Sequence, residues 1–425
     1  MSFGSINTKN AYKEFCQSLY RSGVKKEELR QKAREVMKIF GAKNSIQMDD
    51  STIEDQNQFL IEDDEEENIL HTAAYGGPED TVQPLHMRSD SIEATDKDIE
   101  SSLHTTPLHT TPLHTTPLHT TPLHTTLLHT TPLHSAVRDG DTDTVKRLLG
   151  NGASVEAIDE DNNTPLHLAT RDSHTGVVEL LLGKGALIEA LTKNNDTPLH
   201  LAAWKGHTGV VELLLGKGAL IEALNKHNMT PLHLAARDGH TGVVELLLEK
   251  GAMIEALIED YGNTPLHLAA RDGHTGVVEL LLGKGALIEA LNKHNMTPLH
   301  LAARDGHTGV VELLLGKGAP IEAIDVNNDT PLHDAAQNGH TGVVELLLGK
   351  GALIEARGGF RHTPLHNAAF NGHTVIVGLL LSKGASIGAR NVFGLTALQL
   401  ARLGRNTDTI QLLRNRAAAI RKGQK

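Results

Sequence analysis

A short motif that recurs at a constant interval limits this chain to folds made by stacking copies of one small unit. The string TPLH begins once in each copy, at Thr131, Thr164, Thr197, Thr230, Thr264, Thr297, Thr330 and Thr363. A relic of it, TALQ, begins at Thr396 and ends the series. Each step is 33 except for one of 34, where an extra residue enters within IEDYGN. Residues 216–248 and 283–315 are identical at every position. A unit this short cannot bury its own leucines, so neighbouring copies must cover them.

Each copy predicts two short helices followed by a hairpin. In one copy, Thr297 is a good helix N-cap and Pro298 occupies the first helical position. Gly306 predicts a left-handed end to that helix, and a second helix is expected from about Thr308. An extended hairpin follows. Asn and Gly tolerate positive φ, and they recur at its bend as Asn162, Asn195, Asn228, Asn295, Asn328 and Gly394.

The elements TPLHxA and GHxxVVxLLLxxGA, present from residue 131 to 395, resemble the ankyrin repeat almost letter for letter. The resemblance implies an all-α repeat solenoid, in which helix-turn-helix units stack and carry β-hairpin fingers. It assigns residues 131–395 to eight ankyrin repeats and residues 396–425 to a C-terminal capping repeat with a basic tail. Ankyrin repeats often carry an Asn that can be hydroxylated where this chain has Glu, so we expect no such regulation at Glu156, Glu189, Glu222, Glu255, Glu289, Glu322 and Glu355.

The part of the chain before Thr131 is organised differently. Residues 1–46 predict a small helical hairpin with two amphipathic stripes, and residues 47–68 predict an acidic linker. Residues 69–103 resemble a degenerate ankyrin repeat, since the interval from Leu70 to Leu103 equals that between TPLH strings. Residues 104–130 repeat HTTPL, whose period of five fits neither helix nor strand and whose prolines disfavour a helix. We expect an expanded low-complexity loop there.

Two series of histidines raise the question of a metal site. One histidine stands in every HTTPL unit, but zinc requires about four preorganised ligands, and nothing in the tract preorganises them. Metal storage is the alternative, and it would require the bound ion content to fall when residues 104–133 are deleted. The histidines of TPLH recur once per repeat, and helices roughly 8–10 Å apart cannot share one ion. We expect these histidines to bond their own threonine and nearby backbone, and we predict no metal and no cofactor.

Composition and motifs argue against several classes of function. The formal charge of −12 argues against general nucleic-acid binding. The sequence contains no run of eighteen apolar residues, so we expect no membrane insertion. The stretch MSFGSINTKNAYKEF lacks the apolar core of a secretory signal. The single cysteine, Cys16, suits a reducing compartment, so we expect a soluble, cytoplasmic protein. Catalytic motifs are missing, which predicts no enzyme and no small-molecule substrate. The alternative is a modifier enzyme with a cryptic catalytic segment in residues 1–68.

Function is expected at positions that differ among otherwise near-identical copies. They are Trp204, Arg237, Arg271, Arg304 and Phe370 on the first helix, and Tyr261, Phe360 and Arg361 at the hairpin tips. Trp, Tyr and Arg often anchor protein interfaces; the alternative is that these positions drift because nothing packs there. We predict a non-enzymatic scaffold or adaptor that binds one or more partner proteins along a concave ankyrin face. The near-identical copies also resemble the tandem ankyrin arrays of intracellular bacteria, which implies an effector delivered into a host-cell cytosol.

Overall fold

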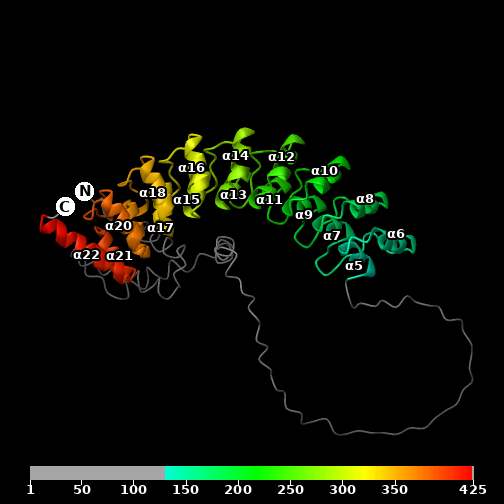
Figure 1. Ribbon diagram of the computed structural model, residues 1–425, viewed down its shortest axis with the longest axis horizontal. Coiled ribbons are helices and arrows are strands. Elements are labelled where there is room, and N and C mark those ends of the chain that lie inside the picture. The colour runs from blue at the N-terminus through cyan, green and yellow to red at the C-terminus, as the bar shows by residue number, and fades with distance from the viewer. Residues whose placement is uncertain (1–129, 424–425) are drawn as a thin grey trace, which may run out of the picture.

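The computed structural model describes residues 130–423, which form a curved stack of helix pairs (Figure 1). The first helices of the pairs are α5 (Pro132–Arg138), α7 (Pro165–Arg171), α9 (Pro198–Trp204), α11 (Pro231–Arg237), α13 (Pro265–Arg271), α15 (Pro298–Arg304), α17 (Pro331–Asn338), α19 (Pro364–Asn371) and α21 (Ala397–Leu403). The second helices are α6 (Thr142–Gly150), α8 (Thr175–Gly183), α10 (Thr208–Gly216), α12 (Thr241–Glu249), α14 (Thr275–Gly283), α16 (Thr308–Gly316), α18 (Thr341–Gly349), α20 (Thr374–Ser382) and α22 (Thr407–Arg421). In Figure 1 the second helices follow the outer side of the arc and the first helices follow its inner side.

Several predicted segments lie outside the described residues. They are the helical hairpin at 1–46, the acidic linker at 47–68, the degenerate repeat at 69–103 and, except for its last residue, the loop at 104–130. The cryptic catalytic segment placed in residues 1–68 also lies there.

The predicted helix ends are confirmed. Thr297 caps α15, with its hydroxyl oxygen accepting from the backbone N–H of His300 and its own N–H donating to His300 Nδ1, at 3.4 and 3.1 Å. Pro298 begins the helix, and Gly306 after it has φ +85°. In the last repeat Gln399 takes the place of the histidine in the same reciprocal cap with Thr396.

The hairpins between repeats are shorter than expected, and residues 130–423 contain no β-strand. The first of them is closed by a hydrogen bond from Asp159 N–H to the Asn163 carbonyl, at 3.0 Å, with Asn162 at φ +58° in the bend. One further bond, from Lys193 N–H to the Asp161 carbonyl, links this tip to the next. So short a segment leaves no room for a ladder of backbone bonds, and the β-hairpin fingers are therefore tight turns. The predicted Asn and Gly bends are nevertheless confirmed.

The core is one continuous apolar cluster that runs from Leu133 to Leu413 through every repeat. In a central repeat, Leu299, Val311 and Leu314 are all 0% exposed. Each such leucine contributes roughly 1.5–3 kcal/mol by its burial. Because neighbours supply the covering atoms, the stability of one repeat depends on the repeats on either side.

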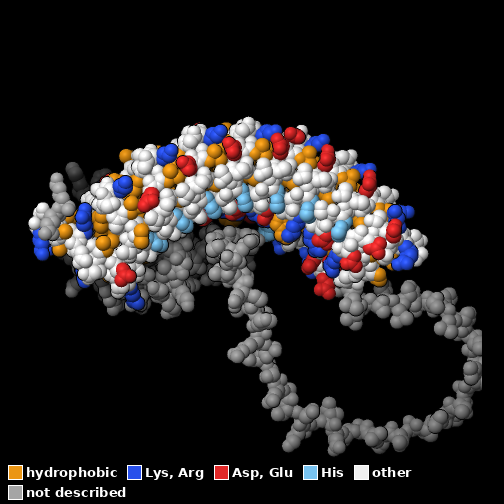
Figure 2. Space-filling model, viewed as in Figure 1, with side chains coloured by type: hydrophobic (Ala, Val, Ile, Leu, Met, Phe, Trp, Pro, Cys, Tyr) orange, Lys and Arg blue, Asp and Glu red, His pale blue; other side chains and the backbone are white. Residues whose placement is uncertain are grey.

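Two rows of histidines tie adjacent repeats together, and histidine side chains follow the arc in Figure 2. In the first row, His200 Nε2 lies 3.0 Å from the Met229 carbonyl, in the hairpin before the next repeat. In the second row, His207 Nε2 lies 2.8 Å from the Arg171 carbonyl of the preceding repeat. The first row thus bonds its own threonine and nearby backbone, as expected, and it also joins neighbouring repeats.

Candidate protein-binding face

The predicted first-helix residues form one row at the ends of the first helices, which follow the inner side of the arc in Figure 1. Trp204, Arg237, Arg271 and Arg304 are the last residues of α9, α11, α13 and α15, and Phe370 is the last but one of α19. All five are half-buried. The row therefore presents part of each side chain to solvent while the rest contacts the array.

Each arginine of the row is paired with the aspartate that follows it. The distances are 2.8 Å for Arg237–Asp238, 2.9 Å for Arg271–Asp272 and 3.4 Å for Arg304–Asp305. The three arginine side chains are 22–35% exposed. Partly exposed pairs of this kind contribute about 0–1 kcal/mol, so an arginine can exchange its aspartate for a partner carboxylate at little cost.

Trp204 interrupts this row of ion pairs. Its neighbour Lys205 places its ammonium 3.8 Å from the centre of the indole ring, an attractive cation–π arrangement. The indole also packs against a small apolar cluster separate from the main core, formed by Met229, Leu234, Ile258 and Leu268. Trp204 thus places an aromatic and apolar contact between repeats whose first helices end in Arg–Asp pairs.

The predicted hairpin-tip residues lie at two places. Tyr261 is half-buried, and its carbonyl accepts from Lys293 N–H of the next tip. Phe360 and Arg361 lie together in η2 (Gly359–Arg361), with φ of +53° and +56°. The ring of Phe360 stands 5.8 Å from that of Phe393, and Arg361 is exposed. Tyr261 and Phe360 are three repeats apart, so the predicted residues extend along the array and do not form one pocket.

The sequence reasoning missed a pair of carboxylates on the same side of the stack. Asp334 stands where five earlier repeats have Leu, and Asp329 stands where two repeats have Met. Asp334 is 9% exposed, and its Oδ2 has no hydrogen-bond partner among the described residues. Burial raises the pKa of Asp334 well above its usual range, and burial with the nearby charge of Asp325 raises the pKa of Asp329 to about 7. In the sequence, the signal for this buried carboxylate is the replacement of Leu by Asp in one copy.

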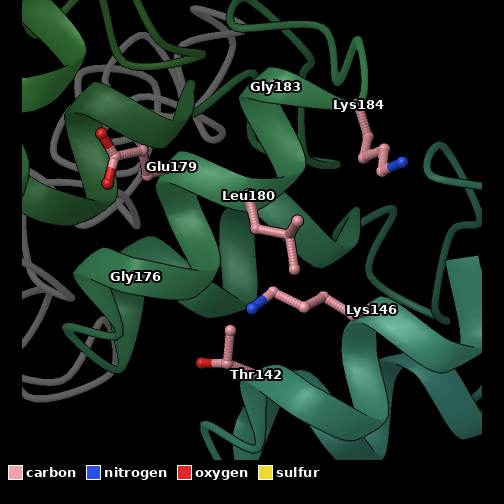
Figure 3. A pocket seen from close by; sticks show the side chains of 7 residues that line it. All are labelled: Thr142, Lys146, Gly176, Glu179, Leu180, Gly183 and Lys184. Atoms are coloured by element: carbon pink, nitrogen blue, oxygen red, sulfur yellow. The ribbon is translucent and has the colours of Figure 1, made fainter.

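A shallow depression of about 410 Å³ lies between α6 and α8, on the outer side of the described array (Figure 3). Its lining residues are Thr142, Lys146, Gly176, Glu179, Leu180, Gly183 and Lys184. In Figure 3 the Lys146 side chain points toward Thr142 and Leu180, whereas Glu179 and Lys184 point away from it. No two ionisable side chains converge there, so the depression offers no acid–base chemistry.

Residues 130–423 provide neither a metal site nor a membrane-spanning helix. In this range, no group of three or more His, Cys, Asp or Glu side chains is arranged to hold a metal ion. No helix in the same range is long and apolar enough to span a bilayer.

Comparison with known proteins agrees with the geometry. The family model described as ankyrin repeats (3 copies) matches residues 10–190, 133–225, 199–292, 284–358 and 353–423. A search of curated proteins finds no match to this chain. The matched ranges cover most of the sequence, and the described part shows the stacked helix pairs that the motifs predicted. The chain therefore belongs to the ankyrin-repeat family.

Proposed function

We propose that this chain is a non-enzymatic scaffold or adaptor that binds a partner protein along the inner face of its array. Ankyrin repeats are in general protein–protein interaction modules, and solenoids bind across extended concave surfaces. The observation that carries the proposal is Trp204 with Lys205, which replaces the Arg–Asp pair of the sister repeats in one row.

The replacement is informative because the rest of the repeat is copied almost without change. The helix that ends at Trp204 has the sequence PLHLAAW, and its neighbour α11 has PLHLAAR. Since arginine ends the neighbouring helix, the fold does not require tryptophan there. A half-buried indole under an ammonium group supplies a rigid apolar contact area with a polar edge, which is typical of an interface anchor.

The spread of the row indicates a macromolecular partner. Trp204 and Phe370 lie on α9 and α19, five repeats apart. With neighbouring first helices roughly 8–10 Å apart, this separation is about 40–50 Å, which is too long for one small molecule. A protein surface with an apolar contact for Trp204 and carboxylates for the arginines would complement the row.

The matched variant for a test is Trp204→Arg with Lys205→Asp, because it gives this repeat the residues of its neighbours. Proteins captured from a cell lysate by the wild type would be identified, and their Kd measured for the wild type and the variant. We expect the variant to bind the relevant partner at least tenfold more weakly, about 1.4 kcal/mol, with an unchanged thermal midpoint. Lys184→Ala in the outer depression is the control and should bind as the wild type does. Equal affinity for wild type and variant would remove the central support for the proposal.

We also propose a cytosolic setting, either in the cell that makes the protein or in a host cell that receives it as a bacterial effector. The support is the single cysteine and the resemblance of near-identical copies, such as 216–248 and 283–315, to arrays of intracellular bacteria. Immunodetection in fractionated host cells tests delivery, and recovery only with the producing cells would contradict it.

A further inference from the structure

The turns that join each second helix to the next hairpin expose two rows of aliphatic side chains. The first row is Leu187, Leu220, Met253, Leu287 and Leu353, and the second row is Ile158, Leu191, Leu224, Leu257, Leu291 and Ile324. These eleven side chains are 51–62% exposed. We call the two rows together the leucine ridge. Singly exposed leucines are common, whereas eleven aliphatic side chains that recur in register along the array are a candidate interaction surface.

The backbone holds the ridge residues in a fixed register. In one repeat the turn is closed by a bond from Ala223 N–H to the Leu220 carbonyl, at 3.2 Å. The Leu220 N–H donates to Glu189 Oε1 of the preceding repeat, at 2.8 Å. The same bond recurs along the array, from Leu187, Met253, Leu287 and Leu353 to Glu156, Glu222, Glu255 and Glu322. The glutamates therefore hold the turns together while the leucines point outward, so the ridge is preformed for binding.

Polar residues end the first row on both sides and the second row on its C-terminal side. In the first row, Ser154 and Ser386 occupy the positions before Leu187 and after Leu353. In the second row, Arg357 and Arg390 follow Ile324. The apolar surface is thus finite, which favours a closed assembly over an open filament.

The charges beside the ridge do not favour an anionic lipid surface. An exposed lysine follows the second helix of each repeat from α8 to α20, just before the first row, as Lys184 does before Leu187. The second helices from α8 to α18 each carry at least one glutamate, and Lys284 Nζ lies 3.9 and 3.8 Å from Glu245 and Glu249. An apolar strip with both signs of charge beside it fits another protein surface of the same kind.

We propose that the leucine ridge is the interface of a homodimer, in which a second copy of this chain covers it. A second copy carries the same exposed aliphatic side chains at the same spacing, so the side chains of one leucine ridge can pack against those of the other. Burying a whole leucine removes roughly 100 Å² of apolar surface, so the ridge presents on the order of 600 Å². With the flanking polar rim, this approaches the roughly 800 Å² per partner of a stable interface.

The test measures the mass of the full chain in solution by sedimentation equilibrium, from about 1 to 100 µM. We expect the wild type to form a dimer with twice the 45.8 kDa of one chain. Leu224→Lys with Leu257→Lys should raise the dimer Kd about 100-fold. Val375→Lys is the matched control, because Val375 is 70% exposed and lies on α20, off the ridge.

Far-UV circular dichroism and thermal midpoints check that all three proteins are equally folded. A wild type that stays monomeric at the highest concentration would overturn the proposal. Sedimentation of that monomer with phosphatidylserine vesicles would show instead that the ridge binds an anionic lipid surface. A double variant that dimerises as tightly as Val375→Lys would also overturn the proposal.

Discussion

His267 makes the stability of the array depend on pH. Its imidazole is 0% exposed. Thr264 N–H lies 3.2 Å from Nδ1, and the Met296 carbonyl lies 3.0 Å from Nε2. A backbone N–H only donates and a carbonyl only accepts, so the proton of the neutral ring is on Nε2. Burial lowers the pKa of His267 from 6.5 to about 4, and a second proton on Nδ1 would face the Thr264 N–H.

The sign of the effect follows from the difference between the two states. The unfolded chain takes up the proton near pH 6.5 and the folded chain near pH 4, so the unfolded state binds more protons between these values. The contribution of His267 to stability is complete above pH 6.5 and is lost as the pH falls toward 4. By about pH 5 the loss is about 2 kcal/mol from this one residue.

The variant that isolates the effect is His267→Gln, because the last repeat uses Gln399 in the same cap, 2.9 Å from the Thr396 N–H. Urea unfolding followed by circular dichroism gives the free energy of unfolding near pH 8 and near pH 5. We expect the wild type minus variant difference to fall by about 2 kcal/mol between these pH values. Comparing the two proteins at each pH cancels the opposite effect of Asp329, whose raised pKa makes stability fall as the pH rises.

The control is Leu266→Ala on the same helix, where a fully buried side chain is lost at a cost of about 2–5 kcal/mol. That cost should be the same at both pH values, because no titrating group changes. If the wild type and His267→Gln differ by the same amount near pH 8 and near pH 5, the buried neutral imidazole is refuted.

Three further changes have predictable effects on stability. Asp334→Leu should stabilise the array by about 2 kcal/mol near pH 8, because leucine, which the sister repeats carry, replaces a buried carboxyl group whose Oδ2 has no hydrogen-bond partner among the described residues. The gain should shrink near pH 5, because the raised pKa of Asp334 makes its destabilising effect smaller as the pH falls. A destabilised variant in urea unfolding would contradict the reasoning. Gly239→Ala should destabilise by more than about 1 kcal/mol, since Gly239 has φ +80° and an added Cβ would stand 2.5 Å from His274 Nδ1. Gly216→Ala at the end of α10 meets no atom within 4 Å and should be neutral or stabilising by up to about 1 kcal/mol in thermal unfolding.

The candidate binding face shows where sequence reasoning was sufficient and where it was not. Comparing near-identical copies singled out Trp204 and the arginines, and the structure places them in one row. The ion pairs of the arginines with the following aspartates, and the packing of Trp204 on the cluster that includes Met229, depend on which side chains the fold brings together. The exposure of the ridge leucines likewise depends on the turns that the fold places at the surface.

The period, the helix pairs, the caps at Thr297 and Gly306, and the Asn bends could all be predicted from the amino-acid sequence. All of these depend on interactions between residues a few positions apart, so the sequence of each copy specifies its own local structure. The hydrogen bonds and the burial between neighbouring copies could be established only from the fold. The bond from His200 to the Met229 carbonyl spans 29 residues, and the burial of Asp334 arises where neighbouring repeats meet. Contacts between repeats form only when the stack closes around them, and no short segment contains both partners.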